Sequence, residues 1–219
     1  MPAWSYSAIK TFNQCPKKYY HINFKKDVKF DETDQIRFGN KVHKVAEENT
    51  KYKKPIPKEF DFLVPVLNGL DSIGGTSLCE LKLAVKWVAD KLVACDYFDK
   101  NTWWRGAADR VIFKDSLAYS VDYKTGNAKY ADTKQLDLIA GALFIKYPEV
   151  KKIKSALIFV QNGEMVKETH EATHAEDYLL SFKDDVDRLE HTIQTGEWIA
   201  KPSRLCNWCN VTHCQFRES

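Results

Sequence analysis

The order of strand, helix and strand in the middle of the chain restricts the possible folds most strongly. Residues 117–123 have the pattern of a β-strand, residues 133–144 that of a buried helix, and residues 153–160 that of a buried strand. A helix that joins neighbouring strands in this way makes them parallel, through a right-handed crossover. The turn at residues 161–164 then predicts an antiparallel hairpin. The sequence therefore predicts a mixed sheet.

The segments before this unit predict a helix followed by an antiparallel meander. Residues 35–49 form an amphipathic helix whose apolar stripe contains Phe38, Val42, Val45 and Ala46. Alternating apolar residues from Glu80 onward predict one strand, and residues 91–95 predict a second. A third begins at Trp103 and ends before the turn at residues 114–116. We expect an α/β fold in which helices flank the sheet.

The outer segments predict further helices. Residues 5–20 indicate a helix that is interrupted at Cys15-Pro16, and residues 50–78 indicate loops around a short helix. Residues 173–176 form a capping box, which predicts a long helix that ends near Gly196.

Two carboxylates and a lysine are the first candidates for chemistry. Asp122 and Lys124 are two residues apart on a strand, so both side chains point to one face. A hairpin can bring Asp109 beside Asp122. Carboxylates supply the oxygen ligands that Mg²⁺ or Mn²⁺ prefers, and a lysine nearby can orient an attacking water. The commoner role of an Asp-x-Lys pair on a strand is a solvated surface.

His43 and Glu80 extend this candidate set. His43 lies at the edge of the apolar stripe of the 35–49 helix, where it can supply a third metal ligand beside the two aspartates. Glu80 opens the first strand and is a further acidic candidate, although a strand-edge glutamate is the commoner role.

Four of the six cysteines suggest a second metal site. Cys206, Cys209 and Cys214 have the spacing C-x2-C-x4-C, which packing explains poorly. The fourth ligand can be Cys15 or His213. The remaining two, Cys79 and Cys95, are expected to be core residues or free thiols.

Composition limits the class of protein. A chain of 219 residues is expected to form one domain, or one domain with an appended flap, and 33 basic against 30 acidic residues do not by themselves indicate nucleic acid. The lysines are clustered, however, which suits a phosphate backbone, although a solvated surface is the commoner role of any one cluster. No apolar leader precedes the first helix, and the longest apolar run, residues 138–145, is too short to span a bilayer. We expect a soluble, cytoplasmic protein without a membrane partner.

The ordered set of motifs resembles the PD-(D/E)XK nuclease superfamily. The motifs are Gly39-x3-His43, Gly106-x2-Asp109-Arg110, Asp122-Tyr123-Lys124-Thr125-Gly126 and Gln135. They look most like the RecB-type branch, which includes the AddB nuclease domain and the nucleases of CRISPR adaptation. The resemblance implies a restriction-endonuclease-like core at residues 35–196. Residues 1–34 and 197–219 are expected to form a cysteine staple around it, within one nuclease domain.

The resemblance also implies residue roles. His43, Asp109, Asp122 and the Tyr123 carbonyl correspond to the metal ligands, Lys124 to the catalytic lysine, and Gln135 to the first residue of a Gln-x3-Tyr motif. Ile139 stands where that motif has tyrosine. The remaining motif residues correspond to the ligands of a [4Fe–4S] cluster: Cys15, Cys206, Cys209 and Cys214. The last cysteine gap has four residues where the branch usually has five, and Zn²⁺ is the alternative.

The expected function is metal-dependent hydrolysis of DNA by an exonuclease, in recombination, repair or end processing. Single-stranded ends are expected because exposed aromatic rings can stack on unpaired bases, although core burial is the commoner role for several of them. The candidate rings are Tyr19, Tyr20, Trp103, Trp104 and Trp208. The alternatives are a structure-selective endonuclease and a non-catalytic DNA-binding module. Recombination or replication proteins are expected partners.

Overall fold

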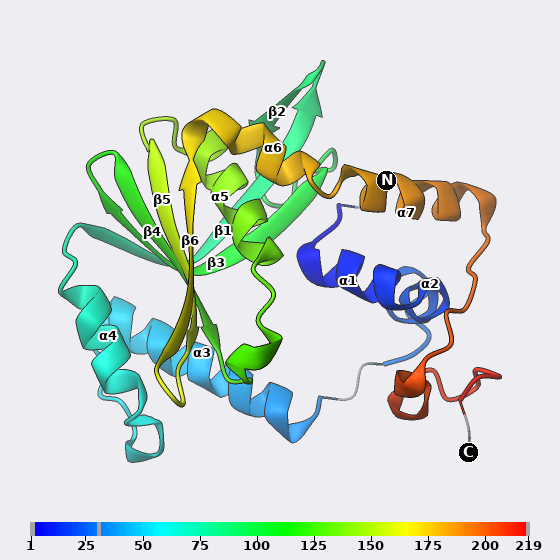
Figure 1. Cartoon of the computed structure of the whole chain (residues 1–219), viewed down its shortest axis with the longest axis horizontal. Helices are drawn as coiled ribbons and strands as arrows, with labels where there is room; N and C mark the ends of the chain where they lie inside the picture. Colours follow the sequence, from blue (N-terminus) through cyan, green and yellow to red (C-terminus); the bar gives the residue numbers. More distant parts are fainter. Residues whose placement is uncertain (1–2, 30–31, 218–219) are drawn as a thin grey trace. The chain divides into compact units, whose positions relative to one another are not determined.

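The computed structural model describes residues 3–29 and 32–217, which form two compact units (Figure 1). The first unit contains Met1–Thr33 and Ser181–Ser219, and the second contains Asp34–Leu180. The larger unit holds the sheet, and the smaller one holds both ends of the chain.

The sheet of the larger unit has the strand order β2-β1-β3-β4-β5-β6 among the described residues. The strands are β1 (Thr76–Val88), β2 (Lys91–Ala94), β3 (Trp104–Lys114), β4 (Leu117–Lys124), β5 (Lys152–Phe159) and β6 (Glu164–Glu171). Strands β4 and β5 are parallel, and every other neighbouring pair is antiparallel. The helix α5 (Lys134–Lys146) connects the parallel pair. The predicted mixed sheet and hairpin are confirmed.

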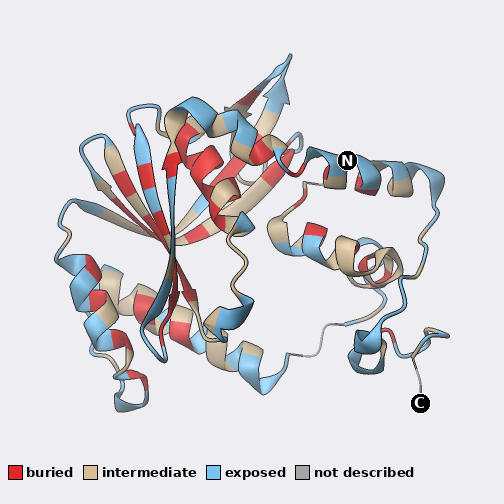
Figure 2. Cartoon of the chain, in the orientation of Figure 1, coloured by how far each residue is buried: buried red, intermediate tan, exposed pale blue. Residues whose placement is uncertain are grey.

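Helices cover both faces of the sheet (Figure 2). The alternation of side chains along each strand decides which of them meet the helices. The helices α3 (Asp34–Tyr52) and α4 (Leu63–Asp71) share a core with Val121 and Tyr123 of β4. The opposite core contains Leu136 of α5 together with β5 residues. Because alternate residues of a strand point to opposite faces, Asp122 and Lys124 point toward α5.

The strands β3 and β4 separate within the sheet. Their pairing runs from Lys114–Leu117 to Arg110–Val121, and beyond that rung β3 pairs only with β1. The next residues along the two strands are Asp109 and Asp122. Both aspartates therefore lie at the fork where the sheet opens.

The smaller unit consists of short helices. Its elements are α1 (Tyr6–Gln14), α2 (Pro16–Tyr19), η1 (Tyr20–Phe24), α7 (Lys183–Thr195) and η5 (Arg204–Trp208). The predicted interruption at Cys15-Pro16 is confirmed, since Cys15 has an extended backbone with φ −165°. The Asn13 amide donates to Asp185 at 2.9 Å, which holds α1 against α7. Three rings surround Trp198 at centroid distances of 5.1–6.0 Å: Tyr19, Tyr20 and Phe24.

Two details of the prediction are wrong. The strand expected to begin at Glu80 begins at Thr76, after a Gly74-Gly75 turn. The long helix expected after residue 173 is divided into η4 (Ala172–His174), α6 (Ala175–Leu180) and α7. It breaks at Phe182, which has φ −102° and ψ 4° and whose ring lies 5.9 Å from that of Trp4. Packing against a distant residue outweighs the local helical pattern.

The remaining short elements are η2 (Lys58–Phe60) before α4 and η3 (Ala128–Tyr130) between β4 and α5. The predicted end of α7 at Gly196 is confirmed, because Gly196 adopts a left-handed conformation with φ 73°. No helix in the described ranges is long and apolar enough to cross a membrane.

Candidate metal-dependent active site

Asp109 occupies the fork between β3 and β4. One of its carboxylate oxygens accepts a hydrogen bond from the Tyr123 backbone N–H at 2.7 Å. The other lies 3.2 Å from Nδ1 of His43 on α3. The carboxylate thus supplies an acceptor for the backbone of β4 where β3 has turned away, and it connects the sheet to α3.

Asp122, Lys124 and Gln135 form a closed ring of polar contacts on the α5 side. The Lys124 ammonium lies 2.6 Å from Oδ2 of Asp122 and donates to Oε1 of Gln135 at 3.1 Å. The Gln135 amide donates in turn to Oδ1 of Asp122. Two residues farther along α5, Asp137 lies 2.9 Å from the buried His170 of β6, which fixes the first turn of the helix to the sheet. The ring therefore holds the carboxylate and the ammonium in one fixed arrangement.

Glu80 completes a second group with His43 and Asp109. One ligand atom from each of these three residues lies within 4.8 Å of the other two, and all three residues line an open groove along α3. Glu80 has φ +51°, a left-handed conformation that costs a residue other than glycine about 1–3 kcal/mol. The β1–β3 ladder pairs Cys79 with Arg110 and Leu81 with Ala108, but it omits the rung at Glu80. The strained backbone directs a carboxylate to the group.

The electrostatics of the site show an excess of negative charge. Burial, followed by the charge of Asp109, raises the pKa of Asp122 to about 6. Burial and the charges of Asp109 and Glu47 raise the pKa of Glu80. Burial alone would lower the pKa of His43, but the Asp109 hydrogen bond and the nearby carboxylates raise it. Each shift has the sign expected where carboxylates crowd together, and a divalent cation would relieve that repulsion.

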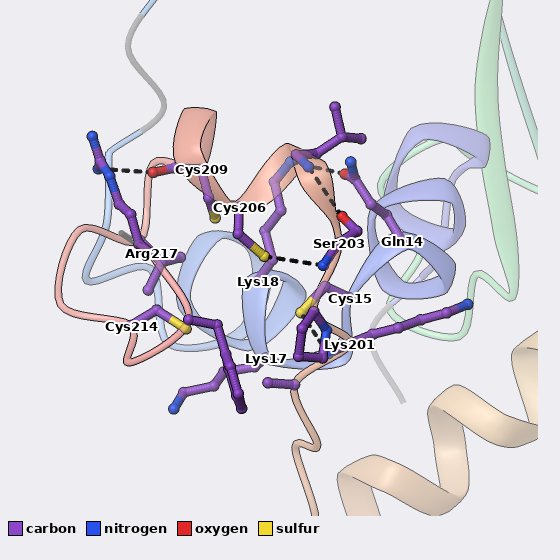
Figure 3. A pocket seen from close by; sticks show the side chains of 15 residues that line it. Gln14, Cys15, Lys17, Lys18, Lys201, Ser203, Cys206, Cys209, Cys214 and Arg217 are labelled. Atoms are coloured by element: carbon purple, nitrogen blue, oxygen red, sulfur yellow. Dashed lines mark hydrogen bonds between the residues drawn. The ribbon is translucent and has the colours of Figure 1, made fainter. Parts of the chain in front are cut away.

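One pocket of the smaller unit is lined by Cys15 together with the three closely spaced cysteines, Cys206, Cys209 and Cys214 (Figure 3). The Lys201 N–H donates to the Cys15 sulfur at 3.4 Å, and the Ser203 N–H donates to the Cys206 sulfur at 3.3 Å. His213 is not among the lining residues; its ring packs 4.6 Å from that of His21. Of the two candidates for a fourth ligand, Cys15 lines the same pocket as the other three cysteines.

Sequence reasoning failed to identify which aromatic rings are accessible. Tyr19, Trp103 and Trp104 are all buried, so they cannot offer a ring face to a base. Of the predicted stacking residues, Trp208 is exposed, at 77%. Phe98 is 72% exposed and was missed, because nothing in its local sequence distinguishes it from a core residue.

Comparison with known proteins identifies the family. None of the curated proteins matches the chain. Among solved structures, that of a "putative exonuclease" from Eubacterium rectale is similar with a TM-score of 0.55 and 12% identity, covering 99% of this chain and 90% of that one. The structure of SSO0001 covers 97% of this chain and 96% of its own, at a TM-score of 0.37 and 13% identity. The family model of the PD-(D/E)XK nuclease superfamily matches residues 3–70 and 81–215. The chain therefore belongs to the PD-(D/E)XK nuclease superfamily, whose members use divalent metal ions to hydrolyse nucleic acid.

Proposed function

We propose that the protein is a Mg²⁺- or Mn²⁺-dependent DNA nuclease that hydrolyses phosphodiester bonds at DNA ends, with single-stranded ends preferred. The proposal rests on two groups of side chains that converge at the fork. The first group lies along the groove and contains His43, Glu80 and Asp109. The second is the ring of polar contacts formed by Asp122, Lys124 and Gln135. The name of the Eubacterium rectale protein agrees with action at ends, although the likeness itself concerns only the fold.

The proposed metal ligands are His43, Asp109 and Glu80, together with Asp122 and the Tyr123 carbonyl that the family resemblance implies. The donors fit a hard divalent ion, because most of them are carboxylate or carbonyl oxygens, which suit Mg²⁺ or Mn²⁺, and the His43 imidazole would be the one nitrogen donor. The raised pKa of Glu80 agrees with this set, because burial first and then the charges of Asp109 and Glu47 make its ionised form unfavourable, and a bound cation would offset both effects. Glu80 lies between the two stretches that match the family model, so its inclusion rests on geometry alone. When bound, such an ion polarises the scissile phosphate and lowers the pKa of a coordinated water.

Lys124 and Gln135 have separate proposed roles. The Lys124 ammonium orients the attacking water and stabilises the negative charge that develops on the phosphate oxygens. Gln135 contacts both Lys124 and Asp122, so it limits both side chains to one rotamer before substrate binds. A group held in advance loses less entropy when the reaction proceeds.

Digestion of end-labelled DNA tests the proposal. Wild-type protein with Mg²⁺ or Mn²⁺ should shorten labelled single strands from an end and leave a covalently closed circle intact. Asp122→Asn and Lys124→Ala should each lower the rate by about 10²-fold or more, while Lys167→Ala, on the exposed side of β6, should not change it. Cleavage of the circle would favour the endonuclease alternative. Equal rates for all variants would show that the fork does not catalyse the reaction.

For the smaller unit we propose a [4Fe–4S] cluster held by Cys15, Cys206, Cys209 and Cys214. Two features support it: the shared pocket, and the backbone N–H groups that donate to two of the sulfurs, as is common around cluster thiolates. A single zinc ion is the alternative. Zn–S bonds of about 2.3 Å would bring the sulfurs to roughly 3.8 Å from one another. Within the described ranges no three of these sulfurs lie within 4.8 Å of each other.

Metal analysis distinguishes the two cofactors. Brown protein that contains iron and acid-labile sulfide would support the cluster, and Cys15→Ala should remove both and lower the melting temperature. Cys95→Ala is the matched control, because this thiol lies near Thr102 in the larger unit and should not affect iron content. Colourless protein with one zinc per chain would replace the cluster with a zinc site.

A further inference from the structure

A surface of cations and aromatic rings lies beside the fork in the larger unit. It consists of Lys82 on β1, Arg105 on β3, and Tyr97 and Phe98 in the loop between β2 and β3; we call these four residues the β1–β3 track. The Lys82 ammonium lies 5.4 Å from both ring centroids, and the Arg105 guanidinium lies 5.6 Å from that of Tyr97. The two rings meet edge to face at 5.1 Å. The track is thus one continuous cluster.

The strand register connects the track to the candidate site. Residues 105, 107 and 109 alternate along β3, so their side chains share one face of the sheet. Lys82 is the cross-strand partner of Ala107 and lies on that same face. At about 3.3 Å per residue, Arg105 is roughly 13 Å from Asp109 along β3. The residue between them on this face is Ala107, whose side chain is a single methyl group.

The loop holds Phe98 outward in a fixed position. The Phe98 N–H donates to Asp96 at 2.8 Å, and the Asn101 N–H donates to Asp99 at 2.8 Å. Asp99 also pairs with Lys86 at 2.6 Å. These contacts occupy two loop carboxylates, and in the described part of the chain neither Lys82 nor Arg105 has a carboxylate within ion-pair distance. A rigid loop therefore presents an exposed ring beside two cations that lack acidic partners.

We propose that the β1–β3 track binds the single-stranded DNA segment adjoining the scissile phosphate. Lys82 and Arg105 would contact consecutive phosphates, and Phe98 would stack on a base. An unpaired strand suits this surface, because its bases expose the ring faces that a duplex covers, and base–aromatic stacking tolerates any sequence. The assignment rests on the proposed nuclease function, and it specifies the form of the substrate and the direction in which it leaves the fork.

Binding measured without cleavage tests the track separately from catalysis. Fluorescence anisotropy of a labelled single strand in EDTA should show that Phe98→Ala weakens binding by about 5-fold or more, while Phe98→Trp retains it. Lys82→Ala should lower the slope of log K against log salt by about 0.7, the value for one phosphate contact on a single strand. Lys154→Ala is the matched control, because this ammonium also lies over a ring, that of Tyr119, at 5.9 Å on β5. It should change neither quantity.

The outcomes separate the two proposals. Unchanged affinity in Phe98→Ala, with an unchanged melting temperature, would overturn the track, even if the wild-type protein cleaves DNA. An equal loss of affinity for blunt duplex would overturn the assignment to a single strand. If Phe98 and Lys82 contribute to binding as expected but the wild-type protein cleaves nothing with Mg²⁺ or Mn²⁺, the nuclease proposal fails and the binding surface stands.

Discussion

Replacing Glu80 by glycine should stabilise the metal-free protein and weaken its binding of divalent metal. Glu80 combines a left-handed backbone, φ +51°, with a carboxylate whose pKa is raised by burial and by the neighbouring acids. Both properties oppose folding at neutral pH. A raised carboxylate pKa means that the folded state binds protons more tightly than the unfolded state. The charged form is therefore unfavourable in the fold above the unfolded pKa.

The magnitude follows from opposing backbone effects. Relief of the left-handed strain contributes about 1–3 kcal/mol. The added freedom of glycine in the unfolded chain costs about 0.5–1 kcal/mol. The net stabilisation is about 1 kcal/mol, before any gain from removal of the charge. In a chain of this length, that corresponds to a melting temperature higher by about 2–4 °C.

Thermal unfolding in EDTA and calorimetric titration with Mn²⁺ measure the two effects. Asp115→Gly is the matched control, because Asp115 has a similar φ of +54° in the exposed turn between β3 and β4, remote from the ligand group. It should show the thermal stabilisation and keep the metal affinity. Glu80→Gln keeps the strain and removes the charge, so it should lose metal affinity with a smaller thermal gain.

Either of two results would refute the assignment of Glu80 as a strained metal ligand. If Glu80→Gly melts lower than wild type in EDTA, the strained conformation does not oppose folding. If it binds Mn²⁺ with wild-type affinity, the carboxylate is not a ligand and the strain at Glu80 has another cause.

Three further predictions concern other contacts. Gln135→Ala should lower kcat with little change in metal affinity, because it frees Asp122 and Lys124 to leave their fixed rotamers. An effect on metal affinity alone, measured by calorimetric titration with Mn²⁺, would contradict this. In metal-free protein, Asp122→Asn should melt at a higher temperature than wild type, and this difference should grow as the pH rises through about 6. The reason is that the raised pKa of Asp122 makes ionisation of its carboxyl group unfavourable in the fold. A difference in melting temperature that does not depend on pH would oppose the assignment. Arg110→Met should lower the free energy of unfolding, measured in urea, by about 2–3 kcal/mol. This loss is below the range for fully buried ion pairs, because Asp71, the partner of Arg110, is partly exposed. A loss under about 1 kcal/mol would show that the pair contributes little to stability.

The sequence was informative wherever structure follows from local periodicity. The helix at residues 35–49 and the parallel pair of β4 and β5 were predictable, because apolar spacing records which face of each element is buried. Asp122 and Lys124 could be assigned to one face for the same reason, since a strand alternates strictly. Their catalytic roles stay a prediction.

Features that depend on distant contacts could not be predicted in this way. The left-handed conformation of Glu80 leaves no mark in the alternating pattern of β1, which continues on both sides of it. The break at Phe182 depends on packing with Trp4, far away in the sequence. The exposure of Phe98 depends on hydrogen bonds within its own loop, and aromatic composition alone favoured the buried Trp103 and Trp104 instead.

The separation of β3 from β4 explains why structure and proposed chemistry coincide in this chain. A sheet that opens leaves backbone groups without their ladder partners, and such groups are costly when buried. Asp109 resolves this by accepting the Tyr123 N–H, while its second oxygen stays directed at His43. One carboxylate thus closes the fork and also contributes to the ligand group, so Asp109 is a poor choice for separating catalysis from stability. In the described part of the chain the Asp122 carboxylate contacts the side chains of Lys124 and Gln135, and its isosteric replacement by asparagine can keep the hydrogen bond from Gln135. Asp122 is therefore the residue at which loss of activity can be read without loss of the fold.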